Sequence, residues 1–447
     1  MNQFWERLAR LSPAKRELLL RMVKRDERLG RWMRGLGSPL EPKTISEMAM
    51  EARLDDSIDP SSATPCRSAQ NCVLLTGATG FLGAFLLAEI LVRTQATVHC
   101  LVRAASEMEG AARIRRNLEF YELGARWDEG RIRPVLGDLA RPLLGLSGGH
   151  FDQLAEDTDT IFHSGALVKW TYPYDGLRAA NVFGTHEILR LAARQRLKPV
   201  HFISTVGVFA SGDAQRRVME SDPLESSGPL YIGYAQSKWV AEKLVVHAAQ
   251  RGLPATIYRP NIGPHSVTGV FNPNDHVSLM LKGCVQLGAA PNLDLRVSGA
   301  PVDYVAAAIV HLSGRPEALG RVFHLVNEND MTWSELCGWF SSWGYRISVE
   351  PYGTWRDLLH TALRSRQENA LSGLSPLFSD DSLFDFVRLP AFDTAGARAL
   401  LIPNGIECPP IGERLLAVYR TYYRQSGFLP HVRSGISPHG GELARPR

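Results

Sequence analysis

The sequence predicts an α/β fold, in which helices cover both faces of a parallel sheet and a smaller, mainly helical part follows. One observation is the stretch VLLTGATGFLGAFLLAEILV at residues 73–92, where an apolar strand, a tight glycine turn and an apolar helix follow one another. The second is a series of apolar segments of strand length at residues 96–103, 131–139, 159–168 and 199–205. Strands and helices arranged in this order are typical of the doubly wound Rossmann sheet.

The composition is that of a soluble globular protein. The 447 residues are 45% hydrophobic and 21% charged, which allows two or three domains with sizeable cores. Polar residues and glycines interrupt residues 73–92 too often for a membrane span. The charged start MNQFWERLAR lacks the apolar core of a signal peptide, so we expect a cytoplasmic protein with no membrane contact.

The six cysteines form no CxxC pair and no cluster with histidine at zinc spacing, so we predict reduced thiols and no metal site. They are Cys66, Cys72, Cys100, Cys284, Cys337 and Cys408.

The N-terminal arm is basic. Residues 1–35 contain ten Lys/Arg against four Asp/Glu, while the rest of the chain is close to neutral. Leucines at helical spacing and the Ser12-Pro13 start predict helices over residues 4–34, with an irregular connection over residues 35–70. No nucleic-acid motif accompanies the charge, so a solvated linker helix is the interpretation that we favour over nucleic-acid binding.

The glycine turn predicts a dinucleotide site. Gly77 allows the tight turn, Gly80 lets the backbone approach a pyrophosphate, and Gly83 lets the helix pack against the strand. The helix N-terminus that follows offers free N–H groups to phosphate. A glycine triplet alone is weak evidence, but here a strand precedes it and a helix follows.

The end of the second strand indicates which cofactor binds. An acidic residue at this position would hold the ribose 2′-hydroxyl of NADH. Arg103 stands there instead, and Arg113 and Arg115 follow. Guanidinium groups suit a 2′-phosphate, so the sequence favours NADPH.

Small and polar residues end the third and fourth strands, at the edge of the sheet where ligands of such folds bind. Gly137, Asp138 and Leu139 end one strand, and His163 and Ser164 end the other. We interpret His163 as a hydrogen-bonded core histidine.

A hydroxyl and a tyrosine–lysine pair complete the candidate site. Thr205 ends the fifth strand, next to Ser204, and Tyr234 and Lys238 lie four residues apart on one face of a predicted helix. An unperturbed phenol titrates near pH 10, and a neighbouring ammonium is expected to lower that pKa. With hydride from a nicotinamide, the tyrosine could protonate a developing oxyanion, which predicts carbonyl reduction or its reverse.

These motifs resemble the extended short-chain dehydrogenase/reductase family. Within it, the chain looks most similar to the thioester reductase domains of nonribosomal peptide synthetases and carboxylic acid reductases. The specific likenesses include LVKWTYPYDGLRAANVFGTHEILRLA, GYAQSKWVAEKLV, YRPNIGPHSVTG and GIECPPIGERLLAVYRTYYRQSGFLP, and they extend over residues 45–430.

The resemblance implies a reductase that releases an acyl or peptidyl chain from the phosphopantetheine of a carrier protein as an aldehyde. It implies that Thr205, Tyr234 and Lys238 are catalytic. The implied cofactor contacts are Gly77, Thr79, Gly80, Phe81, Leu82, Gly83, Arg103, Arg113, Gly137, Asp138, Leu139, Ser164, Tyr234, Lys238 and Pro260. Lys169 departs from the pattern, since asparagine is expected there, and this leaves the role of that position open.

The organisation expected from these observations has four parts and a monomeric state. They are a helical arm and linker (1–70), a Rossmann NADPH-binding domain (71–265), a substrate-binding part that also returns strands to the sheet (266–430) and a flexible tail (431–447). No adenylation segment and no DSL-type phosphopantetheine site is recognisable, so either a free-standing reductase or an excised domain fits the sequence.

Several alternatives remain open at this stage. The aldehyde could leave or be reduced again to the alcohol, and the acyl chain is not specified. Another extended reductase acting on a free carbonyl or a nucleotide sugar would share the generic motifs. A cofactor-binding regulator or a cyclising relative would not need the Tyr234–Lys238 pair that this chain has.

Overall fold

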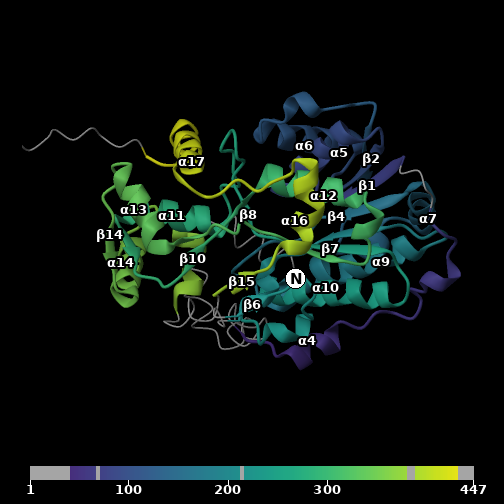
Figure 1. Ribbon diagram of the computed structural model, residues 1–447, viewed down its shortest axis with the longest axis horizontal. Helices are drawn as coiled ribbons and strands as arrows, with labels where there is room; N and C mark the ends of the chain where they lie inside the picture. Colours follow the sequence, from purple (N-terminus) through teal and green to yellow (C-terminus); the bar gives the residue numbers. More distant parts are fainter. Residues whose placement is uncertain (1–40, 67–70, 212–215, 380–387, 431–447) are drawn as a thin grey trace, which may run out of the picture.

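The computed structural model describes residues 41–66, 71–211, 216–379 and 388–430. Figure 1 shows a larger body built on a sheet and a smaller lobe beside it, at the left of the view. The helices predicted over residues 4–34 and the tail after residue 430 lie outside the described residues.

Seven strands form the central sheet: β1 (Cys72–Thr76), β2 (Thr97–Val102), β3 (Ile132–Leu136), β4 (Thr160–His163), β5 (Val200–Ile203), β7 (Ala255–Pro260) and β12 (Val322–Leu325). Their order is β12-β7-β5-β4-β1-β2-β3, and every neighbouring pair is parallel. The direction of winding reverses between β1 and β4, where Thr76 is paired with His163. This confirms the predicted doubly wound sheet, and its switch point lies at the glycine turn.

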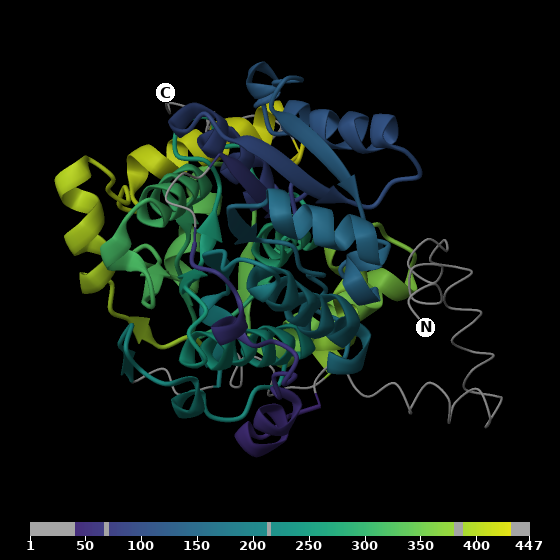
Figure 2. The same cartoon turned by 90° about the vertical axis from the view of Figure 1, so that its right-hand side faces the viewer.

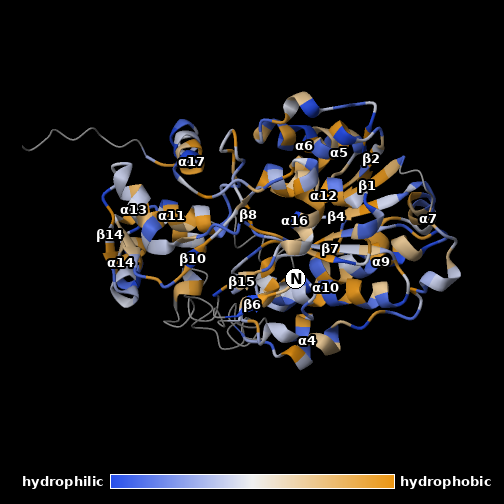
Figure 3. Ribbon diagram, in the orientation of Figure 1, coloured by the Kyte–Doolittle hydropathy of each residue, from blue (hydrophilic) through white to orange (hydrophobic). Residues whose placement is uncertain are grey.

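Helices cover both faces of the sheet: α5 (Phe81–Arg93), α6 (Glu107–Phe120), α12 (Val302–Ser313) and α16 (Ala395–Leu401) on one, and α7 (Gly148–Asp157), α9 (Gly184–Ala193) and α10 (Gly233–Gln250) on the other. Residues of β1 alternate between the two cores, with Val73 and Leu75 in one and Leu74 in the other. A strand buried on both sides has no polar face, which explains why its sequence is continuously apolar. Figure 3 shows this apolar interior in orange.

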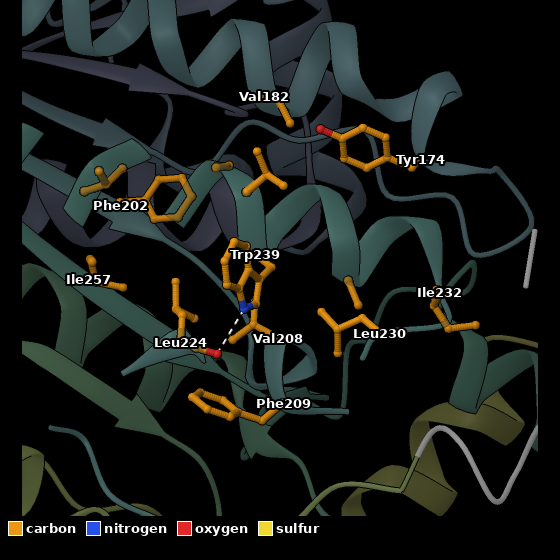
Figure 4. Close-up of a cluster of buried hydrophobic side chains, with 14 of the residues drawn as sticks. Tyr174, Val182, Phe202, Val208, Phe209, Leu224, Leu230, Ile232, Trp239 and Ile257 are labelled. Carbon is orange, nitrogen blue, oxygen red and sulfur yellow. Dashed lines mark hydrogen bonds between the residues drawn. The ribbon is translucent and has the colours of Figure 1, made fainter. Parts of the chain in front are cut away.

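The core beneath α10 is built around Trp239 (Figure 4). This side chain is fully buried, and its indole N–H donates to the carbonyl oxygen of Leu224 at 3.1 Å. Phe202 and Phe209 line the same cluster (Figure 4). The helix that carries Tyr234 and Lys238 therefore stands on a well-packed apolar base.

The smaller lobe contains four helices: α11 (His276–Leu287), α13 (Trp333–Ser342), α14 (Tyr352–Arg364) and α17 (Glu413–Gln425). It also contains two short strand pairs. In one, β9 (Ala289–Pro291) pairs with β14 (Ser348–Glu350), and in the other, β10 (Arg296–Val297) pairs with β13 (Met331–Thr332). In sequence, α12 and β12 fall between its elements, yet both belong to the larger body. The chain therefore passes repeatedly between the two parts. At the junction β8 (Ile262–Gly263) pairs with β11 (Ala300–Pro301), and on the larger body β6 (Arg217–Val218) pairs with β15 (Ala391–Phe392).

The connection over residues 35–70 is more ordered than the sequence analysis expected. Within its described part, Ile45–Glu51 forms α4, which packs on α10 with Met48 fully buried. Figure 2 shows the molecule turned by 90°, with α4 in purple at the bottom of the view. Thr44 caps this helix, and Glu47 accepts a hydrogen bond from the Thr44 N–H at 2.7 Å. This capping box is a local sequence signal that the prediction of an irregular segment overlooked.

Candidate active site

The glycine turn joins β1 to α5 at the centre of the sheet edge. Gly77 has a φ of +82°, and a Cβ at this position would lie 2.8 Å from the backbone nitrogen of Gly165. A Cβ on Gly83 would overlap the carbonyl oxygen of Gly77. Gly80 occupies the N-cap of α5 and provides no side-chain cap, so the first N–H groups of the helix are left for an anion.

Asn117 holds the glycine turn from outside and was not predicted from the sequence. Its amide nitrogen donates to the carbonyl oxygens of Ala78 and Gly80, both at 3.1 Å. The side chain reaches the turn from α6, far along the chain. It fixes the loop that the resemblance assigns to the cofactor, which includes Thr79, Phe81 and Leu82.

Close backbone packing brings the ends of β3 and β4 to the same turn. A Cβ on Gly165 would lie 2.7 Å from the Leu139 side chain, and one on Gly137 would lie 2.7 Å from the carbonyl oxygen of Leu144. Asp138 is half-buried and accepts a hydrogen bond from the Ala140 N–H at 3.0 Å. The structure thus groups Gly137, Asp138, Leu139 and Ser164 around one edge, as the strand-end pattern predicted.

Arg103 and Arg113 lie together at the end of β2. Arg103 is exposed, and the Arg113 guanidinium of α6 donates to its carbonyl oxygen. Within the described ranges neither side chain forms an ion pair, so both charges remain available. Arg115 points elsewhere, because its Nε donates to Glu119 at 3.0 Å.

His163 is a core histidine, which confirms its interpretation. It is 2% exposed, and its Nδ1 and Nε2 lie 2.8 Å from Thr76 Oγ1 and 3.0 Å from Thr185 Oγ1. Thr185 donates in turn to the Asn181 carbonyl oxygen, which makes its oxygen the acceptor for the His163 Nε2–H. Burial lowers the pKa of His163 to about 3, so the ring is neutral.

Thr205 and the Lys238 ammonium both lie at the end of β5. Thr205 Oγ1 accepts from the Gly207 N–H at 3.1 Å and caps the short helix Val206–Phe209, which leaves its own O–H free to donate. Lys238 is 3% exposed, and its Nζ donates to the Ile203 carbonyl oxygen at 2.8 Å. Burial lowers the pKa of Lys238 to about 7, and the Glu242 carboxylate acts against this shift.

Tyr234 stands one helical turn before Lys238, as predicted, but its acidity differs from the prediction. Burial raises the pKa of Tyr234 to about 12, whereas the sequence analysis expected the lysine to lower it. The expectation was wrong for this structure because Lys238 directs its ammonium to a backbone carbonyl and desolvation dominates at the phenol. Tyr234 is consequently a protonated phenol at neutral pH.

Asn181 connects the β4 loop to the helix that carries Tyr234. It lies in the π-helical turn Ala179–Phe183, between α8 (Tyr174–Arg178) and α9, and is 2% exposed. Its side chain accepts from the Leu167 N–H at 2.7 Å and donates to Ser237 Oγ at 2.9 Å. Ser237 then donates to the Tyr234 carbonyl oxygen at 2.8 Å. π-Helical turns occur frequently at functional sites, but residue spacing alone gave no sign of the partners of Asn181.

Trp170 lies beside Tyr234 and stacks on His276. The Trp170 ring lies 6.4 Å from that of Tyr234, and it lies 3.9 Å from the ring of His276, at the start of α11. The smaller lobe therefore reaches the tyrosine through this stack. Lys169, the departure from the expected pattern, is exposed on the same loop.

Pro260 ends β7 at the same edge of the sheet and is buried. No described group of three or more His, Cys, Asp or Glu side chains is arranged to hold a metal ion. All six cysteines are free thiols. None of the helices in the described ranges is both long and apolar enough to cross a membrane.

The Rossmann sheet, the glycine turn and the Tyr234–Lys238 pair define an NAD(P)-binding reductase of the extended short-chain dehydrogenase/reductase type. Residues 75–309 match the family described as male sterility protein. The chain belongs to this family and, within it, to the terminal reductase domains of nonribosomal peptide synthetases and their polyketide hybrids.

Two solved structures show the likeness. The terminal R domain of the myxalamid polyketide synthase–nonribosomal peptide synthetase pathway is 46% identical with a TM-score of 0.80, over 86% of this chain and 98% of that one. The reductase (R) domain of a nonribosomal peptide synthetase from Mycobacterium tuberculosis is 26% identical with a TM-score of 0.70, over 87% of this chain and 100% of that one.

Curated relatives are much longer proteins. A linear gramicidin synthase of Brevibacillus parabrevis is 41% identical over 87% of this chain, which spans 8% of that protein. The large subunit of the L-2-aminoadipate reductase of Penicillium chrysogenum is 34% identical over 80% of this chain. The chain spans 27% of that subunit. The sequence-based assignment to terminal reductases is thereby confirmed.

Proposed function

We propose that this chain is an NADPH-dependent thioester reductase that releases an acyl or peptidyl chain from a carrier protein as an aldehyde. The observation that carries the proposal is the Thr205, Tyr234 and Lys238 group, at the sheet edge of a chain that belongs to the terminal reductase domains. The names of its relatives, which include an aldehyde reductase of Aspergillus flavus and aminoadipate reductases, agree with this chemistry.

The residues present fit a dinucleotide. The free N-terminus of α5 suits the pyrophosphate, and Gly77 leaves open the space that a Cβ would fill. Arg103 and Arg113 suit a 2′-phosphate, and glutamates appear only later, at the start of α6. These charges support NADPH over NADH. The cofactor contacts that we propose are those implied by the resemblance, with Asn117 added as a residue that holds the turn.

Each catalytic residue has a distinct task. When bound, NADPH supplies the hydride that adds to the thioester carbonyl carbon. The Thr205 O–H donates a hydrogen bond to the carbonyl oxygen, and Tyr234 gives it a proton, so that a hemithioacetal forms. Lys238 has two N–H donors beyond the one that bonds Ile203, and its positive charge favours the phenolate that remains. Collapse of the hemithioacetal then breaks the C–S bond and yields the aldehyde and the pantetheine thiol.

Burial of Tyr234 supports its role as the acid. A phenol with a pKa of about 12 is fully protonated at neutral pH and holds its proton until charge develops on the substrate oxygen. The same residues could reduce the aldehyde to the alcohol in a second round.

We propose that the smaller lobe binds the acyl chain. The stack of Trp170 on His276 brings that lobe within reach of Tyr234, so a chain between the two parts would lie beside the acid. We further propose that the phosphopantetheine arm enters along this junction from a carrier protein. On this basis, substrate binding is assigned to those parts of residues 266–430 that form the smaller lobe. A monomeric, cytoplasmic protein stays a prediction from the sequence.

The proposal is tested with matched thioesters. Purified protein is mixed with NADPH and an acyl-pantetheine thioester, the same acyl group on a carrier protein, the free acid, a simple ketone or a nucleotide sugar. We expect NADPH oxidation only with the two thioesters, with one aldehyde and one thiol formed per first turnover. Oxidation driven only by the ketone or the nucleotide sugar would favour the rival reductase. Cofactor binding without turnover would favour a regulator.

A further inference from the structure

A fully buried ion pair lies directly behind Lys238. Glu242, one helical turn further along α10, is 0% exposed and accepts from Arg259 Nε at 3.0 Å and Nη2 at 2.6 Å. Its second oxygen accepts from the Ser204 hydroxyl at the end of β5. Arg259 comes from β7 and is 1% exposed. The pair therefore ties together the three elements that form the floor of the catalytic site.

The far side of Arg259 meets a neutral histidine. Its Nη1 lies 3.2 Å from His324 Nε2, and His324 Nδ1 donates to the Asp393 carbonyl oxygen at 2.8 Å. His324 Nε2 therefore carries the lone pair that accepts the hydrogen bond from Arg259, and the ring is neutral. Burial and the neighbouring guanidinium lower the pKa of His324 to about 4. Glu242 is the carboxylate that binds Arg259 directly.

Apolar rings surround the two cations. The Arg259 guanidinium lies 4.9 Å from the centre of the Phe209 ring, and Lys238 Nζ lies 4.0 Å from that of Phe202. Both rings belong to the cluster around Trp239 (Figure 4). Charges interact more strongly in such surroundings than in water.

A buried pair of this kind is weak evidence for stability, because apolar side chains of similar size often stabilise a core as well. A contribution to the charge on its neighbour is a better reason for its presence. We propose that the Glu242–Arg259 pair is a positioning and charge-setting device for Lys238, which holds the ammonium charged at the Ile203 carbonyl while Tyr234 reacts. This inference rests on the catalytic role that the proposed function gives to Lys238.

The charged groups around Lys238 make the sign of the effect definite. The Glu242 carboxylate favours its ammonium form, Arg259 binds that carboxylate from β7, and His163 on β4, within electrostatic reach of Lys238, is neutral. Tyr234 lies one helical turn before Lys238 on α10, and Ser204 and Thr205 follow β5, where the ammonium donates to Ile203. Of these described groups, Glu242 is the anion and Arg259 the second cation. Loss of Glu242 leaves two buried cations together and should lower the pKa of Lys238. Loss of Arg259 leaves the carboxylate uncompensated and should raise it.

Lysine NMR measures this directly in the whole protein. Lysine is scarce in the chain, so selective 13C labelling of lysine gives few signals, and Lys238→Met identifies the one of interest. We expect Glu242→Gln to move the Lys238 titration down by about one pH unit and Arg259→Met to move it up by about one. The double variant, which buries no unpaired charge, should return to within about half a unit of wild type. Glu242→Asp keeps the charge and serves as the matched control.

A second measurement uses turnover. The ammonium is the active form, so NADPH oxidation should decline as pH rises through the Lys238 titration, earlier in Glu242→Gln and later in Arg259→Met. The inference requires a shift of stated sign from each single variant. If one variant does not fold, the shift in the other variant still tests the inference. Unchanged NMR titrations, or shifts of the same sign in both variants, would overturn the inference while leaving the proposed function standing. Normal turnover in Lys238→Met would instead remove the catalytic role of Lys238.

Discussion

Asn181 offers the sharpest test of how the structure holds the helix that carries Tyr234 and Lys238. The side chain is 2% exposed and makes three hydrogen bonds, two with the Leu167 backbone at 2.7 and 3.1 Å and one to Ser237 Oγ at 2.9 Å. Asn181→Ala removes all three and leaves their partners without a replacement. Ser237, which donates to the Tyr234 carbonyl oxygen, loses its anchor.

The expected loss follows from these bonds. A net hydrogen bond contributes about 1 kcal/mol, and a buried partner left unsatisfied costs about 1 to 3 kcal/mol. Leu167 is half-buried, so water can replace part of the hydrogen bonding that its backbone loses. We therefore expect Asn181→Ala to lower the free energy of unfolding by about 2 to 4 kcal/mol. A displacement of Tyr234 by about 1 Å should also reduce kcat by roughly 100-fold.

Urea unfolding followed by tryptophan fluorescence, together with NADPH oxidation, checks both values. Asn404→Ala is the matched control, because Asn404 is exposed yet also makes side-chain hydrogen bonds, and it should change the unfolding free energy by less than about 0.5 kcal/mol. If Asn181→Ala unfolds like wild type and keeps its kcat, the π-turn does not position the helix that carries Tyr234, and the reasoning is refuted.

Three further variants test other parts of the site. Tyr234→Phe removes the proton donor and keeps the ring, so kcat should fall by about 100-fold or more while NADPH affinity, measured by fluorescence, stays nearly constant; a near wild-type kcat would exclude Tyr234 as the acid. Arg103→Ala should raise the KM for NADPH by roughly 10- to 150-fold, because a lost charge-assisted contact costs about 1.5 to 3 kcal/mol. The KM for NADH should change little, and equal effects on both cofactors would mean that Arg103 is structural. The basic residues 1–35 are either a solvated linker or a segment that attracts an acidic carrier protein. If they attract the carrier, their deletion should slow reduction of an acyl carrier protein at low salt but spare acyl-pantetheine, and the effect should shrink near 0.15 M salt, where charges are screened beyond about 8 Å. If both substrates respond alike, carrier docking lies elsewhere.

Local patterns were sufficient to predict the frame of the site. Each of the first five strands, the glycine turn and the helix with Tyr234 and Lys238 depends on residues close in sequence, and the structure has all of them. The capping box at Thr44 was equally local, and α4 could have been predicted from it.

Long-range partners were beyond such patterns. The hydrogen bond from Asn181 reaches Ser237 on another helix, and Trp170 meets His276 only because the smaller lobe folds back onto the β4 loop. The pKa of Tyr234 was misjudged for the same reason, since burial of the phenol depends on tertiary packing. Sequence spacing places Lys238 beside the phenol, but it cannot show that the ammonium is held by a strand carbonyl.

Hydride transfer to the thioester carbon is the most direct test of the central claim. The protein is incubated with an acyl-pantetheine thioester and NADPH that carries deuterium at both C4 positions, and the products are identified by mass spectrometry before much aldehyde can be reduced again. We expect an aldehyde with one deuterium on its carbonyl carbon, together with an equal amount of free pantetheine thiol and NADP⁺. An unlabelled product, or the free acid formed without NADPH oxidation, would contradict the proposed reduction.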